Sequence, residues 1–404
     1  MARTRTEILI AGGGIAGLTA ALTFGRAGFR TVLVSPEPPV TEGAADRSDL
    51  RSTAFLRLAI SLFERIGLWD DLATTATPLN MLRVVDTVGW PPAIRDSREF
   101  DAADLGQQSF GWNLMNWRVL QGLIRVLGGM ENVELRFGTR FSAMVARDNE
   151  VIVRLSDGDS VVAKLLIGAD GRGSAVREAA GIGVRTTHYG QKTLAFVVSH
   201  PKSHNNVSTE IYNEGGPFTL VPLPDVDGHP ASAVVWMNPG SHAQELATMP
   251  AVEFEARMSE RSCYMLGPLH LRSERRLWPI ISQRAERLSA RRVAIMAEAA
   301  HVIPPIGAQG LNTSLNDLIL LRDEALKAGR DGLGGAAMLA AYDRCRSTDI
   351  RRRVAAIDLF NRVTRSPDPR MQMLRLTGMK TIHDIAGLRR AVMRAGMGAA
   401  GVSS

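Results

Sequence analysis

A short apolar strand, a glycine-rich turn and a helix follow one another near the start of the chain, and this succession constrains the fold most. The stretch Glu7-Ile-Leu-Ile-Ala-Gly-Gly-Gly-Ile-Ala-Gly17 places a Gly-x-Gly-x-x-Gly motif directly after the strand. Gly12 allows a tight turn, Gly14 lets backbone N–H groups approach a pyrophosphate, and Gly17 lets helix and strand pack closely. A helix and a second strand complete the unit over residues 18–34. The pattern predicts an α/β, Rossmann-like domain that binds a dinucleotide.

Ser35 stands where the second strand of such a unit ordinarily ends in an acidic residue. The usual acid binds a ribose hydroxyl, and the nearest one here, Glu37, comes two residues later. Serine can also hydrogen-bond a ribose, so we expect Ser35 to contact the cofactor. A glycine turn in an unrelated α/β unit stays open as the alternative.

Composition limits the class of protein. The chain has 404 residues, of which 45% are hydrophobic and 22% charged, which suits two or more folded units. Cys263 and Cys345 have no disulfide or metal-ligand spacing, so we expect no metal site and a reducing compartment. No apolar run approaches about 18 residues, and residues 8–11 are too short for a signal-peptide core. We therefore expect a cytoplasmic protein.

Two later segments distinguish FAD from NAD. Residues 165–177 predict a buried strand that ends at Asp170 and Gly171, where α/β sheets bind ligands, although a turn with a helix N-cap would look the same. Residues 292–317 predict a strand, a glycine-rich turn and a helix start. Free N–H groups near residues 310–312 suit the electron-rich edge of an isoalloxazine. The two segments favour FAD.

At these three segments the sequence resembles the FAD-dependent aromatic hydroxylases of the para-hydroxybenzoate hydroxylase fold, over nearly the whole chain. The resemblance narrows to the hydroxylases of ubiquinone biosynthesis through residues 49–54, 62–69, 189–191, 216–217 with 220–223, and 309–312. It implies an FAD-binding domain (residues 1–75, 100–180 and 285–330), an interleaved, mainly β substrate-binding domain (76–99 and 181–284) and a basic, amphipathic C-terminal helical region (331–404).

The resemblance also implies roles for individual residues. The residues that would hold FAD are Gly12, Gly14, Ile15, Ala16, Gly17, Ser35, Arg51, Arg118, Asp170, Gly171, Glu298, Gly307, Gly310, Leu311 and Asn312. Among them, Arg51 would reach the phosphate or ribose side, and residues 310–312 would face the flavin ring. Candidates for substrate contact are Tyr189, Tyr212, Phe218 and Pro304. No side chain is expected to be catalytic, because the flavin carries the chemistry.

The implied reaction is hydroxylation of an aromatic ring. NAD(P)H, a transient co-substrate, would reduce FAD, O2 would add at flavin C4a, and the hydroperoxide would transfer one oxygen. The resemblance points to a polyprenylated phenol of the ubiquinone pathway. Two alternatives stay open, a small soluble aromatic acid as substrate, and a weakly flavin-binding or non-catalytic scaffold in a membrane-associated biosynthetic complex.

The scaffold alternative is motivated by departures from the family pattern. Ala297-Glu298 replaces Gly-Asp, and Ala308 stands in the glycine turn, where a Cβ is costly if the residue needs positive φ. With Ser35, these changes could weaken FAD binding. The neighbouring His301 is expected to be a packed histidine that bonds a nearby carbonyl rather than a catalytic base.

Positive charge gathers near the C-terminus. Residues 344–394 hold 13 Lys and Arg against 4 Asp and Glu, interleaved with apolar residues, which predicts amphipathic helices. Two interpretations have equal weight: peripheral contact with the inner face of a membrane, through Arg365, Arg370, Arg375 and Lys380, or terminal helices packed on the domain with a solvated basic face. No nucleic-acid motif accompanies the charge, so nucleic acid is not an expected partner.

Overall fold

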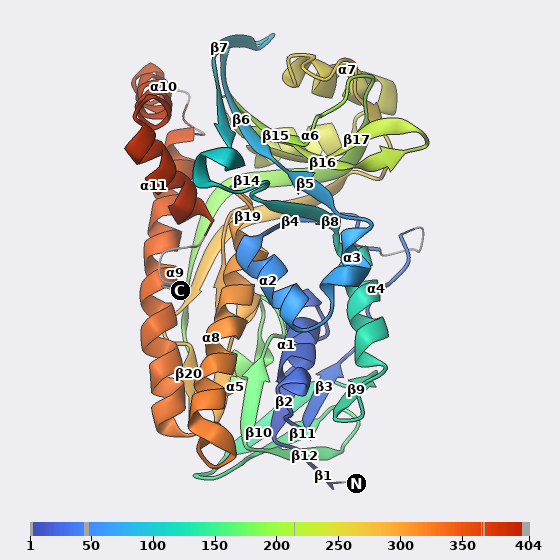
Figure 1. Ribbon diagram of the computed structural model, residues 1–404, viewed down its shortest axis with the longest axis vertical. Helices are drawn as coiled ribbons and strands as arrows, with labels where there is room; N and C mark the ends of the chain where they lie inside the picture. Colours follow the sequence, from blue (N-terminus) through green and yellow to red (C-terminus); the bar gives the residue numbers. More distant parts are fainter. Residues whose placement is uncertain (1–2, 44–47, 214, 365, 367, 398–404) are drawn as a thin grey trace.

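The computed structural model describes residues 3–43, 48–213, 215–364, 366 and 368–397. These residues form an α/β fold with a large sheet toward each end and long helices along one side (Figure 1). The expected class, a Rossmann-like domain with an interleaved, mainly β domain and C-terminal helices, is confirmed.

The lower sheet in Figure 1 carries the glycine motif. Its six strands among the described residues run in the order β20-β21-β13-β2-β3-β9, parallel except for β20 beside β21. β2 is fully buried, as its apolar run predicts for a strand covered on both faces. The bounds are β2 (Ile8–Ala11), α1 (Ile15–Arg26), β3 (Thr31–Ser35), α4 (Asn116–Leu127), β9 (Val133–Phe137), β13 (Leu165–Gly168), α5 (Ala175–Ala179), β20 (Ser289–Ala290) and β21 (Val293–Ile295).

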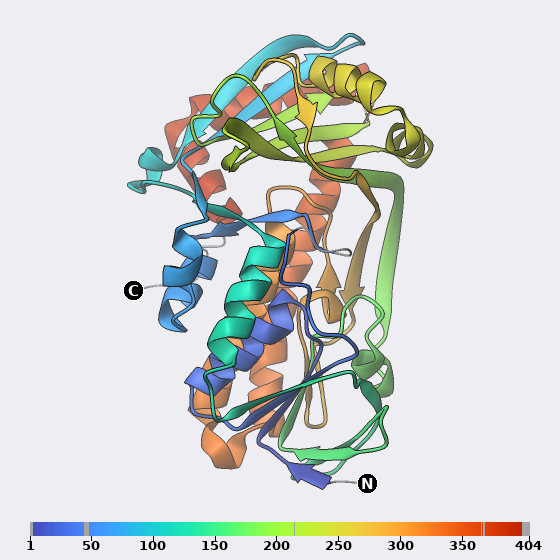
Figure 2. The same ribbon diagram turned by 90° about the vertical axis from the view of Figure 1, so that its right-hand side faces the viewer.

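Helices and a small sheet accompany this parallel sheet. α1 packs against both α4 and α8 (Gln309–Gly332), and the three helices lie together on one side in Figure 2, blue, teal and orange. Smaller elements complete this half: β1 (Arg3–Arg5), β10 (Phe141–Ala146), β11 (Val151–Leu155) and β12 (Ser160–Ala163) in one sheet, β4 (Ser52–Leu56), β5 (Thr77–Leu79) and β8 (Gly111–Met115) in another, and α2 (Arg57–Arg65) and α3 (Trp69–Ala73).

The upper sheet is mainly antiparallel and has nine strands among the described residues. Helices α6 and α7 cover one face, where Phe196, Trp236 and Phe254 pack together. β14 is the longest strand and joins the two halves of the molecule (Figure 2). The bounds are β6 (Met81–Val88), β7 (Ala93–Asp101), β14 (Val184–Ser199), β15 (Val207–Asn213), β16 (Gly216–Val226), β17 (His229–Pro239), β18 (His270–Leu271), β19 (Arg276–Ala285), β22 (His301–Val302), α6 (Gly240–Thr248) and α7 (Ala251–Arg261).

Four helices end the described chain: α8 (Gln309–Gly332), α9 (Ala336–Thr364), α10 (Pro369–Asp384) and α11 (Ala386–Gly396). α9 runs beside both halves of the molecule, and α10 packs against α9 and β7. Arg375 fixes α10, because its buried guanidinium donates to Asp86 on β6 at 2.5 Å. The membrane interpretation, one of the two left open, places Arg375 toward lipid, and for this residue it is wrong because the side chain is inside the protein. Arg365 lies outside the described residues.

Candidate cofactor and substrate site

A cavity of about 2280 Å³ is lined from both halves of the molecule. Its wall includes the turns after β2 and β13, the turn before α8, the face of the upper sheet away from α6 and α7, and parts of α9, α10 and α11. One small ligand ordinarily occupies roughly 300–1,000 Å³. The cavity therefore has room for a cofactor and a second molecule.

The turn after β2 opens backbone groups to this cavity. Gly14 is the N-cap of α1 and makes no side-chain cap, and a Cβ on Gly14 would have no neighbour within 4 Å. A Cβ on Gly12 would lie 2.2 Å from the Ala169 carbonyl oxygen, and one on Gly17 would lie 1.9 Å from the Gly12 carbonyl oxygen. Gly12 and Gly17 therefore close the turn, while Gly14 leaves free space before the unsatisfied N–H groups of α1. Gly14, Ile15 and Ala16 line the cavity.

A second helix start opens to the same cavity. α8 begins after Ala308 with no side-chain cap, and Gly307, Gly310 and Leu311 line the cavity. Added Cβ atoms on Gly310 and Gly171 would also meet nothing within 4 Å. One helix start suits a pyrophosphate and the other suits the electron-rich edge of a flavin. These residues therefore fit FAD.

Two alanines that replace family glycines adopt left-handed backbone conformations. Ala297 has φ 55° and Ala308 has φ 56°. A left-handed alanine costs about 1–2 kcal/mol. Ala308 therefore has the positive φ at which a Cβ is costly, and Ala297 has it too. Both turns nevertheless form, and Gly307 and Gly310 around Ala308 still line the cavity.

The Asn312 side chain holds the α8 start in place rather than facing the cavity. Its carboxamide oxygen accepts from Leu56 N at 2.9 Å, and its nitrogen donates to the Ala54 and Ala308 carbonyls at 2.8 and 2.7 Å. The side chain is buried and does not line the cavity. For Asn312, the expectation that residues 310–312 face the flavin therefore rests on the backbone, because β4 and the turn use all the polar atoms of its side chain.

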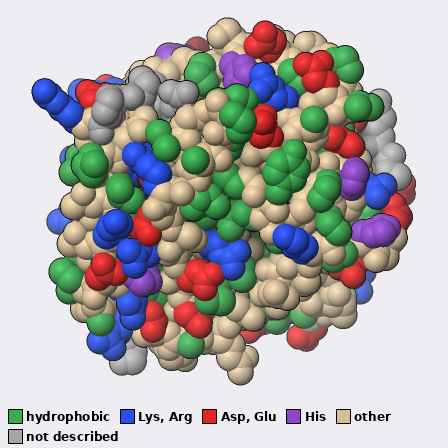
Figure 3. All heavy atoms as spheres, turned by 90° about the horizontal axis from the view of Figure 1, so that it is seen from above, with side chains coloured by type: hydrophobic (Ala, Val, Ile, Leu, Met, Phe, Trp, Pro, Cys, Tyr) green, Lys and Arg blue, Asp and Glu red, His purple; other side chains and the backbone are tan. Residues whose placement is uncertain are grey.

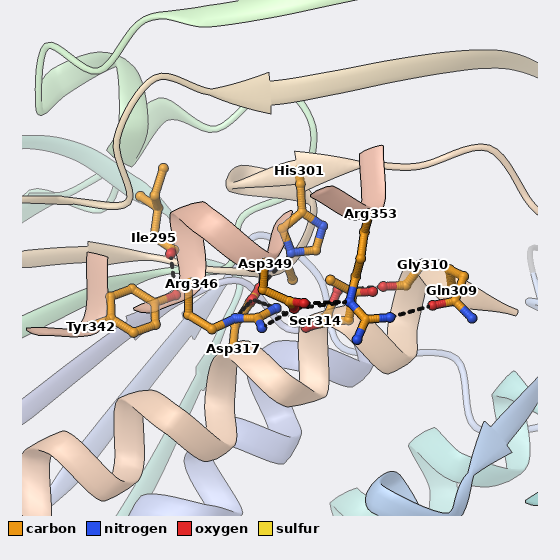
Figure 4. Close-up of polar contacts among 12 residues, drawn as sticks. Ile295, His301, Gln309, Gly310, Ser314, Asp317, Tyr342, Arg346, Asp349 and Arg353 are labelled. Carbon is orange, nitrogen blue, oxygen red and sulfur yellow. Dashed lines mark hydrogen bonds and ion pairs between the residues drawn. The ribbon is translucent and has the colours of Figure 1, made fainter. Parts of the chain in front are cut away.

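Asp317 organises a buried ionic cluster behind the turns (Figure 4). Its carboxylate bonds His301 Nε2 at 2.7 Å, Arg346 Nε at 2.8 Å and the Ala297 N–H at 3.1 Å. Burial alone would raise the pKa of Asp317, but His301 and Arg346 lower it below its ordinary value. His301 is thus a packed histidine as expected, although its partner is a carboxylate and not a carbonyl.

Two buried polar atoms in residues that line the cavity have no partner among the described residues. They are His301 Nδ1 and Asn113 Oδ1. Buried polar atoms are ordinarily satisfied. Their position in the cavity wall agrees with contact to a bound molecule.

Arg51 and Glu298 lie in the cavity wall. Arg51 donates to both carboxylate oxygens of Asp49, at 2.8 and 2.7 Å, and its guanidinium lies 4.9 Å from the Trp278 ring centroid. Asp49 also accepts from Asn116 Nδ2 at 2.9 Å. Arg51 is therefore held at the wall by an acid and an aromatic ring, where it would contact the cofactor.

Three expected cofactor contacts are engaged elsewhere. The Ser35 hydroxyl donates to the Glu37 carbonyl, Arg118 stacks on Trp117, and the Asp170 carboxylate accepts from Ser174 and Val176 at the start of α5. None of the three lines the cavity, although Gly171 does. The N-cap of α5 is Ser174, and the Asp170 carboxylate supports this helix start.

Tyr212 reaches the cavity from the upper sheet, together with an acid that sequence reasoning missed. The Tyr212 hydroxyl donates to Glu210 at 2.5 Å, and both residues line the cavity on β15. Burial raises the pKa of Glu210, which the Tyr212 hydrogen bond partly offsets. Tyr212 also packs edge-on against Phe360 of α9. The pair places hydrogen-bonding groups beside aromatic surface.

The other expected substrate contacts lie away from this cavity. Phe218 is fully buried against Trp236 under α6 and α7, because alternate residues of β16 face opposite sides and Thr219 and Val221 face the cavity. Pro304 is buried and its neighbour Pro305 lines the cavity instead. Tyr189 lines a separate small pocket and donates to Asp358 at 2.8 Å. These three expectations are corrected.

Comparisons with known proteins agree with this site. A family model described as "FAD binding domain" matches residues 5–356. Ubiquinone hydroxylase UbiL of Rhodospirillum rubrum is 32% identical over 97% of this chain and 89% of its own length, and 3-demethoxyubiquinol 3-hydroxylase of Escherichia coli is 27% identical over 98% and 100%. The structure of p-nitrophenol 4-monooxygenase PnpA from Pseudomonas putida DLL-E4 superposes with a TM-score of 0.78 at 20% identity, covering 98% and 99%. The chain therefore belongs to this FAD-binding family, as an FAD-dependent aromatic hydroxylase similar to those of ubiquinone biosynthesis.

Proposed function

We propose that this protein hydroxylates the ring of a polyprenylated phenol in ubiquinone biosynthesis, with O2 and NAD(P)H. The carrying observation is the cavity, which continues from the two open helix starts to the C-terminal helices. Its wall on α10 and α11 is mostly apolar and includes Met379, Ile382 and Met393. Such a wall suits a long hydrocarbon chain attached to the reacting ring.

In this proposal the protein's own residues bind the cofactor and the substrate and orient them toward each other. Bound FAD, reduced by NAD(P)H, supplies oxygen activation. Gly14 and Gly171 have no side chain, so they would let FAD approach the protein backbone closely. Gly310 and Leu311 would support the flavin ring from the start of α8. The upper sheet forms one wall of the cavity and would shield a bound cofactor from water on that side, which protects its reactive forms from wasteful reaction with solvent.

Glu210 and Tyr212 would orient the ring of the substrate. The sheet face around them presents Val84 and Val221 together with the hydroxyl side chains of Thr219 and Ser208, and Glu210 adds a carboxylate there. Asp86 also faces the cavity, but Arg95 and Arg375 engage both its oxygens. Glu210 has no ion pair among the described residues, and its remaining acceptor sites can bind a phenolic hydroxyl.

The test is purification, flavin quantification and assay. We expect about one FAD per chain, and NAD(P)H oxidation stimulated by a short-prenyl phenol, with a product heavier by one oxygen atom. A colourless protein that cannot take up FAD would favour a scaffold. Turnover of a small aromatic acid in place of the prenylated phenol would replace the substrate assignment while keeping the enzyme class.

A further inference from the structure

We propose that helices α9, α10 and α11 dock on an anionic lipid surface and open the cavity toward it. The membrane contact is argued from surface features alone. The role of the cavity as an entry route for the substrate rests on the proposed function. No helix of the described residues is long and apolar enough to cross a membrane. Amphipathic helices that carry exposed cations contact a bilayer at the headgroup level.

Large apolar side chains are exposed on these helices. Seven of the fifteen strongly exposed large hydrophobic residues in the described chain lie between residues 359 and 392. We call them the apolar set: Leu359, Phe360, Met373, Leu374, Ile385, Leu388 and Val392. Exposed apolar groups gathered in this way mark a contact with another molecule or a membrane.

The apolar set frames the mouth of the cavity. Leu359, Phe360, Leu374 and Val392 are exposed and also line the cavity. They come from all three helices, so the cavity reaches the surface between them. An apolar molecule that leaves a bilayer here would meet these four apolar side chains first.

Exposed positive charges lie on α10 and α11, two of the helices that carry the apolar set. Arg370, Lys380, Arg390 and Arg394 are exposed and make no ion pair within the described residues. The acids of the same helices are engaged: Asp349 with Arg346 and Arg353, Asp358 with Arg362, Asp384 with Arg98 and His383, and Asp368 at the start of α10. Free cations beside exposed apolar groups match the headgroups and acyl boundary of an anionic membrane.

Ion pairs fix the positions of α10 and α11 on the protein without any membrane. Arg375 and Asp86 fix α10 to the upper sheet, and Arg389 bonds Asp104 at 2.8 Å to fix α11. Figure 3 looks onto the end of the molecule where α10 and β7 lie and shows hydrophobic side chains interspersed with charged ones. A ligand recognised by phosphate alone would leave the apolar set unused, which favours lipid over nucleic acid or an acidic protein.

The experiment is co-sedimentation of the flavin-loaded protein with vesicles of phosphatidylcholine, with or without phosphatidylglycerol. We expect binding to the anionic vesicles that weakens with salt. The paired change Arg390→Glu with Arg394→Glu should weaken it about 30-fold or more. Leu388→Glu or Met373→Glu, at sites outside the cavity lining, should also weaken it.

Matched controls are Arg154→Glu and Val145→Glu, exposed residues on β11 and β10, which should bind vesicles like the original protein. Unchanged flavin content and circular dichroism will show that each variant is folded. Lack of binding to anionic vesicles would overturn the proposal. So would binding lost on charge reversal but unaffected by both Leu388→Glu and Met373→Glu, since that pattern belongs to a phosphate-only partner. Vesicle binding without hydroxylation of a prenylated phenol would refute the proposed substrate and leave the docking intact.

Discussion

The Asp317 carboxylate of α8 lies 2.7 Å from His301 Nε2 of β22, and both side chains are buried. Arg346 of α9 reaches the other carboxylate oxygen, so one acid ties three elements together behind the cavity wall. The same carboxylate accepts from the N–H of Ala297, which has a left-handed backbone. The cluster therefore supports the turn that presents Glu298 to the cavity.

Asp317→Asn should lower the free energy of unfolding by about 3–5 kcal/mol, because it leaves buried Arg346 short of its main counter-charge. Denaturant unfolding followed by circular dichroism measures this. Asp323→Asn is the control, since that acid is partly exposed and pairs with the adjacent Arg322, and its effect should stay below about 1 kcal/mol. Equal effects of the two substitutions would show that the cluster contributes no more than a surface pair.

The contribution of Asp317 should depend on pH in a defined direction. Its pKa in the folded protein is below the ordinary 3.8, so its stabilisation is complete above that value and declines as pH falls through the folded pKa. The stability difference between the original protein and Asp317→Asn should therefore be constant near neutral pH and shrink below about pH 4. A difference that grows on acidification would contradict this linkage.

Ala297→Gly and Ala308→Gly should each stabilise the protein. Glycine removes the left-handed cost of about 1–2 kcal/mol, and the greater freedom of the unfolded chain offsets about half of it, so a gain of about 0.5–1 kcal/mol is expected. Ala300→Gly is the matched control, because Ala300 has φ −94° and should lose about 0.5–1 kcal/mol. Thermal unfolding compares the three, and a loss in all of them would show that neither turn stores strain.

Local patterns in the sequence predicted the cofactor half well. The strand, Gly-x-Gly-x-x-Gly and helix over residues 7–26 depend on contacts between near neighbours, and the structure forms them as expected. The cost of a positive φ at Ala308 could also be predicted, because it depends on the backbone preference of alanine alone. The partners of Asn312 and Arg375, in contrast, lie at Ala54, Leu56 and Asp86, and contacts so distant in sequence leave no local pattern.

The substrate half was harder to predict because one face of its sheet packs under α6 and α7, the other lines the cavity, and both carry apolar residues. On β16 the buried Leu220 and the cavity-facing Val221 are equally apolar, so hydrophobicity does not separate the faces. Phe218 was assigned to the cavity for its aromatic ring, although its strand position places it opposite. Glu210 could have been noticed as an isolated acid two residues before Tyr212 in a strand-like run.

Gly14→Val should reduce FAD binding and leave the fold intact. The new side chain would enter the free space before α1, where no protein atom lies within 4 Å of the added Cβ, so we expect at least about tenfold weaker binding. Gly12→Ala is the contrasting variant, because its Cβ would meet the Ala169 carbonyl oxygen at 2.2 Å and destabilise the protein itself. Flavin titration with circular dichroism separates the two, and full FAD affinity in Gly14→Val would place the pyrophosphate elsewhere.

Glu210→Gln should impair hydroxylation without reducing FAD content, because Glu210 lines the substrate part of the cavity. If its carboxylate accepts a hydrogen bond from the substrate hydroxyl, kcat/KM for the prenylated phenol should fall about tenfold or more, since bonds to charged groups contribute about 1.5–3 kcal/mol. Burial raises the pKa of Glu210 above 4.5, so the acid limb of the kcat/KM profile should lie above that value and vanish in Glu210→Gln. Ser208→Ala, on the same strand face, is the control and should keep both the rate and the limb. An acid limb that survives in Glu210→Gln would assign it to another group and leave Glu210 a structural partner of Tyr212.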